Sequence, residues 1–292
     1  MMLHVKSFLA VLCIILLPST VSGGKEHYLL KTGKAASDRL ERQHQTFLIA
    51  SSDHLRRAGL SKGLIVWDIG CGNGAMTEYL AKKVGPDGHV YAIDISEAQL
   101  NVTKERIHKK GLTNVTFVHG DIAQLSSLPN SKPDLMYMRL VLMHQPNPQS
   151  IIKSLLSLLK TGGVVVSQES CIETAYPLFH FPVIRAYLNT VTTLGTKLGV
   201  DYNIGNKTAQ LFQTAGFKNV IAYTTQQTLS TAEMKGALLK SLSEWKDKAI
   251  NKNILDHNTA KQWEEALRAL PDNNVPAFKT AQQTHVIARK SL

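Results

Sequence analysis

Three glycines at alternate positions form a candidate ligand site in this sequence. Gly70, Gly72 and Gly74 follow the apolar run Leu64–Trp67, and the pattern over Met76–Lys83 is that of a helix. A strand, a glycine turn and a helix together bring backbone N–H groups close to a nucleotide-like ligand. Glycine is required there because a Cβ atom would block the turn or hold the ligand away. The stretch therefore predicts a binding site without identifying the ligand.

Three acidic residues lie at the ends of consecutive expected strands. Asp68 ends the first strand, Asp94 ends the second, and Asp121 follows the third. In a doubly wound sheet, the carboxyl ends of the strands line one crevice where ligands bind. A carboxylate at the end of the second strand can accept hydrogen bonds from both hydroxyls of a ribose. We therefore expect the three acids to face one ligand that contains a ribose.

The same glycine turn also fits a second class of ligand. The spacing from Gly70 to Ala75 satisfies the dinucleotide fingerprint, and an NAD-type ligand would explain Asp94. It gives no role to Asp68 or Asp121, and a pyrophosphate gains nothing from a carboxylate beside the turn. S-adenosylmethionine carries a sulfonium and an ammonium at that end and has no phosphate. The acids therefore favour S-adenosylmethionine, and an NAD-dependent enzyme is the weaker alternative.

Sequence patterns typical of strands and of helices alternate from Leu64 to Ser167. This alternation would position the glycine turn and the three acids at the ends of the strands. The strand segments are apolar runs, as expected where helices cover both faces of a parallel sheet. The expected strands are Leu64–Trp67, His89–Ile93, Val115–Val118, Leu135–Tyr137, Val164–Ser167, Val220–Thr225 and His285–Arg289. We predict an α/β fold with a doubly wound (Rossmann-like), seven-stranded, mostly parallel sheet.

The composition is that of a globular protein and narrows the range of partners. The chain of 292 residues is 43% hydrophobic and carries a net charge of +11. Its lysines are spread without an arginine-rich arm or a basic-aromatic stripe, so we favour a solvated basic surface over nucleic acid as a partner. Three widely spaced cysteines, Cys13, Cys71 and Cys171, give no disulfide framework and no metal-binding pattern. We therefore expect no metal site.

Residues 1–23 differ from the rest of the chain. Basic residues precede the apolar run Phe8–Leu17, Pro18 ends it, and Val21–Gly23 supplies small residues at the cleavage positions. This order is typical of a secretory signal peptide, and the run is about half the ~20 residues of a membrane-spanning helix. We predict an exported or membrane-associated protein that contacts a membrane only through this segment. An uncleaved anchor and an apolar N-terminal helix of a cytoplasmic protein are the alternatives.

Several segments, in the expected order, carry a resemblance to a known family. Val66–Gly74 resembles the first motif of class I S-adenosylmethionine-dependent methyltransferases. Tyr91–Ser96 and Val118–Ile122 are similar to their second and third elements, and Leu158–Gly163 to the turn before their fifth strand. Arg139–Pro146 is similar to the ubiquinone/menaquinone-biosynthesis-like group of small-molecule methyltransferases. Order and spacing together make the resemblance specific.

The resemblance implies that the glycine turn holds the methionine part of the cofactor. Gly70, Gly72 and Gly74 would let the backbone approach it, and Asp68 would lie beside the ammonium. Cys71 would contact the cofactor as a small packing residue of the turn and not as a nucleophile.

At the nucleoside end, the resemblance assigns the two remaining acids and their neighbours. Asp94 would accept hydrogen bonds from the ribose hydroxyls, and Asp121 would accept one from the adenine amino group. Ile95 and Gln99 would flank the adenine, and Ile122 would pack on its ring.

The implied reaction is an in-line displacement of the sulfonium methyl group by an atom of a small-molecule acceptor, which leaves S-adenosylhomocysteine. Holding the acceptor close and aligned supplies most of the catalysis, and a general base is needed only if the acceptor keeps its proton at neutral pH. His144, Glu169 and Tyr137 are the candidate bases, and for His144 we favour a structural role in the loop that follows the fourth strand. Arg139 lies where the methionine carboxylate or the acceptor is expected.

In the methyltransferases that this sequence resembles, segments added to the sheet form a lid that selects the substrate. The expected division is a signal-like segment at 1–23, an N-terminal helical lid at 24–60, and a sheet domain at 61–292 with helical insertions at about 172–206 and 228–274. Tyr28, Lys34 and Gln43 could then reach the cofactor or the acceptor. Five lysines make the late helix basic, which we interpret as a solvated face, with an anionic partner or membrane surface as the alternative.

An alternative function from a different class is that of a non-catalytic binding or effector protein with this fold. The signal-like N-terminus motivates it, because S-adenosylmethionine is a cytoplasmic metabolite. The intact acids and glycines favour the enzyme.

Overall fold

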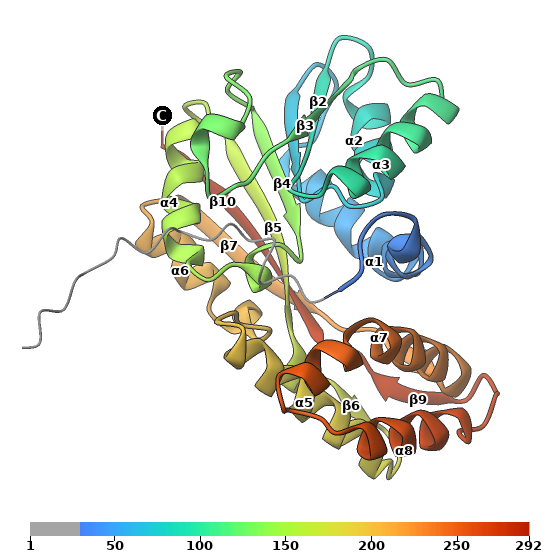
Figure 1. Ribbon diagram of the computed structural model, residues 1–292. Helices are drawn as coiled ribbons and strands as arrows, with labels where there is room; N and C mark the ends of the chain where they lie inside the picture. Colours follow the sequence, from blue (N-terminus) through green and yellow to red (C-terminus); the bar gives the residue numbers. More distant parts are fainter. Residues whose placement is uncertain (1–29, 292) are drawn as a thin grey trace, which may run out of the picture.

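A computed structural model of the chain describes residues 30–291, and its centre is a seven-stranded sheet in the order β3-β2-β1-β4-β5-β10-β7 (Figure 1). The strands are β1 (Ile65–Ile69), β2 (His89–Asp94), β3 (Val115–His119), β4 (Leu135–Arg139), β5 (Val164–Cys171), β7 (Lys218–Thr225) and β10 (Gln282–Arg289). β1 to β5 are mutually parallel, and β10 runs antiparallel to both β5 and β7. The predicted doubly wound, mostly parallel sheet is confirmed.

Helices cover both faces of this sheet. They are α1 (Ser37–Ala58), α2 (Ala75–Val84), α3 (Glu97–Lys109), α4 (Pro148–Leu158) and α6 (Thr208–Thr214). Three further helices, α5 (Pro182–Lys197), α7 (Thr231–Asn251) and α8 (His257–Arg268), lie beyond the end of the sheet. In β4, Leu135 and Tyr137 pack with α1 and α2. Met136 and Met138, which alternate with them, pack with α4 and α6. Because both faces of the strand are buried, its sequence is a continuous apolar run.

Helix starts follow the capping residues in the sequence. Ser96 is the N-cap of α3, and its hydroxyl accepts a hydrogen bond from the backbone N–H of Gln99. Ser230 is the N-cap of α7 and forms a capping box with Glu233. Thr231 is the first residue of that helix.

Beyond the lower end of the sheet in Figure 1, α5, α7 and α8 form a helical layer around a small three-stranded sheet. Its strands are β6 (Tyr176–Pro177), β9 (Pro276–Lys279) and β8 (Thr228–Ser230). The sequence predicted helix over most of this region and missed the small sheet, because strands of two to four residues carry no measurable periodicity. Trp245 of α7 links two helices of this layer, because its Nε1 donates a hydrogen bond of 3.0 Å to Tyr187 Oη of α5.

Within residues 30–291, no helix combines the length and the apolar character needed to cross a membrane. Residues 1–23, with the predicted signal peptide, lie outside the described part of the chain.

A cluster of aromatic and imidazole side chains joins α1 to the sheet. His54 of α1 is fully buried, and its Nε2 lies 3.2 Å from the Ser167 carbonyl oxygen. Since a carbonyl only accepts, Nε2 carries the proton, and Nδ1 accepts from Tyr223 Oη at 3.1 Å. His285 of β10 stacks on Tyr223 and lies edge-on to His54. Burial lowers the pKa of His54 to about 3 and that of His285 to about 4.

This cluster predicts a loss of stability in mild acid. An unfolded histidine takes up its proton near pH 6.5, whereas His54 stays neutral in the fold down to about pH 3. The free energy of unfolding should therefore fall as the pH drops below 6.5, by up to about 1.4 kcal/mol per pH unit for this histidine. We expect urea titrations of His54→Gln to show a shallower decline between pH 6.5 and 5 than wild type, relative to pH 7.5. Equal slopes for the two proteins would contradict the assignment.

Candidate active site

A cavity of about 540 Å³ opens at the carboxyl ends of the parallel strands. The ends of β1, β2 and β4 form its floor, and α1, α5 and α7 contribute its other walls. Its volume is within the range of roughly 300–1,000 Å³ that is typical of small-molecule sites. A smaller hollow of about 50 Å³ adjoins the glycine turn, and Gly70, Gly72 and Arg139 line both spaces.

The glycine turn has a backbone that only glycine adopts readily. Gly70 and Gly72 have φ angles of 69° and 58°, in the left-handed region. A Cβ atom on Gly70 would come within 2.6 Å of Val141 Cγ2, and one on Gly74 within 2.7 Å of Thr103 Cγ2. Gly74 is therefore required for packing against α3, whereas Gly70 and Gly72 border the cavity.

Asp68 lies beneath this turn and is almost fully buried. Its Oδ2 accepts a hydrogen bond of 2.6 Å from Thr77 Oγ1 at the start of α2. Burial raises the pKa of Asp68 to about 6, and the positive charge of Arg139 partly offsets this effect. Asp68, Arg139 and the buried Cys71 all line the small hollow, so a carboxylate and a guanidinium face the same space.

Asp94 ends β2 and lines the large cavity. Its Oδ2 accepts from the Gly72 backbone N–H at 2.9 Å, and its Oδ1 from the Ser96 backbone N–H at 2.9 Å. Burial raises the pKa of Asp94 to about 6, against the effect of these donors. Each oxygen has a further lone pair for a ligand hydroxyl.

Asp121 has one oxygen that lacks a partner. Its Oδ1 accepts from the Ala123 backbone N–H at 2.9 Å, whereas Oδ2 is buried without a hydrogen bond in the described part of the chain. A buried carboxylate oxygen without a donor is costly, and a ligand N–H group would satisfy it. Ile95, Gln99 and Ile122 line the same part of the cavity, so the structure brings together the residues predicted for the nucleoside.

Arg139 and His144 line the cavity at and after the end of β4. Arg139 is the last residue of β4, and its Nη1 lies 3.5 Å from Ser51 Oγ of α1. His144 lines the cavity, with its ring centroid 5.6 Å from that of Tyr202. Burial, together with the positive charge of Arg39, lowers the pKa of His144 to about 3. The imidazole is therefore neutral at physiological pH.

The sequence placed Glu169 wrongly. It was expected to follow the fifth strand on the crevice side, but β5 continues to Cys171 and Glu169 is fully buried within it. Its carboxylate accepts hydrogen bonds from the backbone N–H groups of Val141, Leu142 and Met143, at 2.9 to 3.2 Å. Burial raises the pKa of Glu169 to about 7. Glu169 therefore holds the loop that carries His144, and its orientation does not support a role as a base.

The lid residues divide into those that reach the cavity and those that do not. Gln43 lines both spaces, as expected. Lys34 points away and forms an exposed ion pair with Glu105, so the expectation that it reaches a ligand is wrong. Tyr28 lies outside the described residues. Sequence reasoning missed Arg39 of α1 as a lining residue, because no motif marked it.

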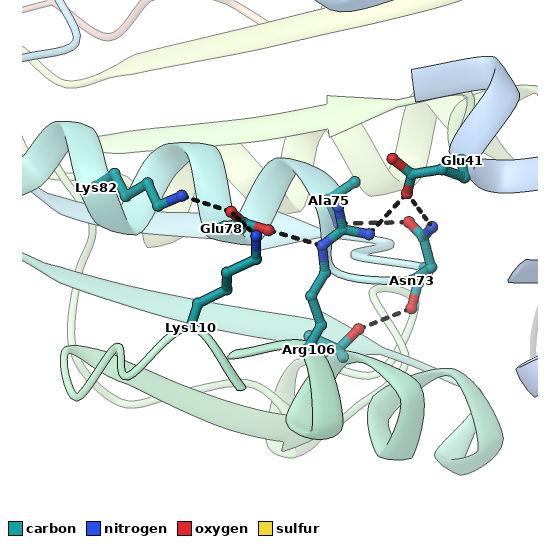
Figure 2. A network of polar contacts seen from close by, with 9 residues as sticks. Glu41, Asn73, Ala75, Glu78, Lys82, Arg106 and Lys110 are labelled. Carbon is teal, nitrogen blue, oxygen red and sulfur yellow. Dashed lines mark hydrogen bonds and ion pairs between the residues drawn. The ribbon is translucent and has the colours of Figure 1, made fainter. Parts of the chain in front are cut away.

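An ion network ties α1 to the glycine turn (Figure 2). Arg106 of α3 donates to Glu41 of α1 at 2.7 Å and to Glu78 of α2 at 2.9 Å. Asn73, inside the turn, donates to the same Glu41 oxygen at 3.3 Å. The network fixes the wall of the cavity relative to its floor.

Fold and site together define an α/β protein with a crevice at the carboxyl ends of its parallel strands. Residues 60–269 match the family model described as a methyltransferase domain. The chain belongs to this methyltransferase family, as the resemblance predicted. The demethylmenaquinone methyltransferase of Geobacillus stearothermophilus is 35% identical over 130 residues, which are 44% of this chain and 53% of that protein. The chain thus spans about half the length of the curated relatives that it matches.

Solved structures share the fold at low sequence identity. A protein of Bacillus halodurans is 18% identical with a TM-score of 0.55, over 83% of this chain and 99% of that chain. Phosphoethanolamine N-methyltransferase 2 of Haemonchus contortus, in complex with phosphomonomethylethanolamine and S-adenosylhomocysteine, is 16% identical with a TM-score of 0.52, over 83% of this chain and 52% of that chain. These likenesses establish the Rossmann-like architecture.

The position of Glu169 predicts a large structural effect of its removal. Glu169→Ala leaves three backbone N–H groups of the cavity floor without their acceptor, and should lower the free energy of unfolding by about 2–4 kcal/mol. Urea denaturation measures this change. The exposed Glu265→Ala serves as the control and should change stability by no more than about 0.5 kcal/mol. Equal stability of the two variants would restore Glu169 as a candidate for chemistry.

Proposed function

We propose that this protein transfers the methyl group of S-adenosylmethionine to a small-molecule acceptor. One observation carries the proposal: the left-handed Gly70 and Gly72 border a single cavity with Asp94 and with Asp121, whose Oδ2 has no hydrogen-bond partner among residues 30–291. Membership of the methyltransferase family supports it. The name of the Geobacillus relative suggests a quinone-type acceptor, which fits the apolar lining of the lid side.

The residues present suit the two ends of this cofactor. Asp121 Oδ2 would accept from the adenine amino group, with Ile122 against the ring and Ile95 and Gln99 beside it. The second lone pairs of Asp94 would accept from the ribose hydroxyls.

At the methionine end, the hollow beside the turn offers complementary charges. Asp68 would face the ammonium and Arg139 the carboxylate, while Gly70 and Gly72 leave room for the chain between them, next to Cys71. The NAD alternative gives no role to Asp68 in this hollow, which disfavours it.

The bound cofactor supplies an electrophilic methyl group, and this chain positions the acceptor and excludes water. His144 borders the cavity as a neutral imidazole that can accept a hydrogen bond. With a pKa of about 3 it is a weak base, so its proposed role is to orient the acceptor.

The cellular location of the protein is the subject of a separate proposal. The signal-like residues 1–23 favour export or membrane association, and N-terminal sequencing of the protein made in cells tests this directly. An intact Met1 would contradict cleavage after Gly23.

Calorimetry of S-adenosylhomocysteine binding, with protein lacking residues 1–23, tests the site. Asp94→Ala should weaken binding by about 10- to 100-fold, because it removes charge-assisted acceptors. His144→Ala should stay within about twofold of wild type. Equal losses in the two variants would contradict the assignment, and binding of NAD in preference to the adenosyl ligand would overturn the proposed function.

The raised pKa values predict a pH dependence of the same binding. Asp68 balances an ammonium charge only when it is ionised, and Asp94 accepts hydrogen bonds from both ribose hydroxyls most strongly in its ionised form; both have a pKa near 6. Affinity for S-adenosylhomocysteine should therefore be constant above pH 7 and fall as the pH drops below about 6, as calorimetry at pH 5, 6, 7 and 8 measures. Asp94→Asn should flatten part of this decline. A pH-independent wild type would contradict the ionised role.

A further inference from the structure

Arg139 is a cation that the described part of the chain does not neutralise. It ends β4, is half-buried, and lines both the large cavity and the hollow beside the glycine turn. Within residues 30–291 it forms no ion pair. A partly buried charge without a counter-ion is costly, so an anionic group of a ligand would stabilise this guanidinium.

The register of the sheet determines the face on which Arg139 lies. Tyr137 of β4 is paired with Asp68 of β1, and Arg139 is paired with Gln168 of β5. Alternate residues of a strand project to one face, and so do paired residues of parallel strands. Tyr137 packs on the side of α1 and α2. Asp68, Tyr137, Arg139 and Gln168 therefore share the face of the sheet that α1 covers.

Ser51 of α1 connects the helix to two of these side chains. Its Oγ donates to Gln168 Oε1 at 2.7 Å, and both residues are fully buried. Because the hydroxyl gives its proton to Gln168, its lone pairs remain for Arg139, whose Nη1 lies 3.5 Å away. His54, three residues further along α1, is bonded to the sheet through the Ser167 carbonyl. Ser51 is therefore an acceptor with a fixed position.

Tyr137 lines the same small hollow as a neutral group. Burial raises the pKa of Tyr137, and the positive charge of Arg139 partly offsets this effect. Its hydroxyl therefore stays protonated at physiological pH, which does not support Tyr137 as a base. Within residues 30–291, the charged side chains that line the hollow are Asp68 and Arg139. A ligand group with one positive and one negative charge would complement this pair.

We infer that Ser51 is a positioning residue for the cofactor: it holds the guanidinium of Arg139 in the hollow, where the guanidinium binds the carboxylate of the methionine part. The inference rests on the proposed function, because it takes the ligand of the hollow to be the amino-acid end of S-adenosylmethionine. A guanidinium that is already held on one side loses less side-chain freedom when it binds a carboxylate. Ser51 thus contributes to affinity without touching the cofactor.

Two ligands with the same nucleoside test this role by calorimetry on the full chain. S-adenosylhomocysteine carries the amino-acid end, and 5′-methylthioadenosine has a methyl group in its place. Ser51→Ala removes the acceptor, Arg139→Met removes the charge, and the double variant combines the two changes. The matched control is Ser52→Ala, because the neighbouring Ser52 donates to the Ile49 carbonyl at 2.9 Å and does not line the hollow.

Ser51→Ala should bind S-adenosylhomocysteine about 3- to 10-fold more weakly than wild type, and 5′-methylthioadenosine within about twofold of wild type. Arg139→Met should lose about 10- to 100-fold for S-adenosylhomocysteine, as expected for a charge-assisted hydrogen bond, and should bind the truncated ligand nearly normally. In the Arg139→Met background, Ser51→Ala should cost less than about twofold more, because Ser51 acts through Arg139. Ser52→Ala should bind both ligands within about twofold of wild type.

Equal losses for the two ligands in Ser51→Ala would indicate a merely structural effect and would overturn the inference. An unchanged affinity for S-adenosylhomocysteine, or an undiminished effect of Ser51→Ala in the Arg139→Met background, would overturn it as well. If Ser51→Ala does not fold, Ser51→Cys fills the site with a weak acceptor and carries the same expectation. These outcomes leave the proposed function in place. That function fails separately, if wild type binds neither ligand.

Discussion

The parallel pairing of β1 with β2 and β4 is the constraint on which the rest of the site depends. Its register places Ile69 beside Ile93, and the Ile93 carbonyl accepts from the backbone N–H groups of Gly70 and Cys71. The glycine turn is thus anchored to the neighbouring strand at the residue before Asp94. Asp94 in turn accepts from Gly72. Strand pairing, turn and ligand-binding carboxylate form one hydrogen-bonded unit, so the floor of the cavity is preorganised.

Charged groups, in addition to the shared hydrophobic core, join the lid to this floor. Glu41 links α1 to α3 and to the glycine turn, and Arg39 links α1 to the buried Glu244 of α7. Buried or partly buried pairs of this kind add little net stability but specify one geometry, since breaking either leaves an uncompensated charge. Arg39 and Glu41 are two positions apart on α1, so one turn of this helix carries both links.

The sequence allowed good prediction wherever function follows from local order. Asp68 and Asp94 end apolar runs, and Gly70 to Gly74 open a helix, so their proximity follows from the topology of parallel strands alone. Prediction failed where contacts between residues far apart in the sequence determine the structure. Pairing with β10 extends β5 through Glu169, which turned an expected loop residue into a buried anchor. Arg39 and Glu244 are 205 positions apart, and no local pattern reveals that they meet.

The helix α1 also limits how a ligand can enter. Its second half belongs to the core, where Leu55 and Ala58 are at most 2% exposed and His54 is bonded to the sheet. Its first half carries Arg39 and Gln43, which border the cavity. A helix of 22 residues is about 33 Å long and moves as a rod, so it cannot swing aside without unfolding the core. Opening of the cavity therefore depends on its other walls, including those that α5 and α7 contribute, and not on α1.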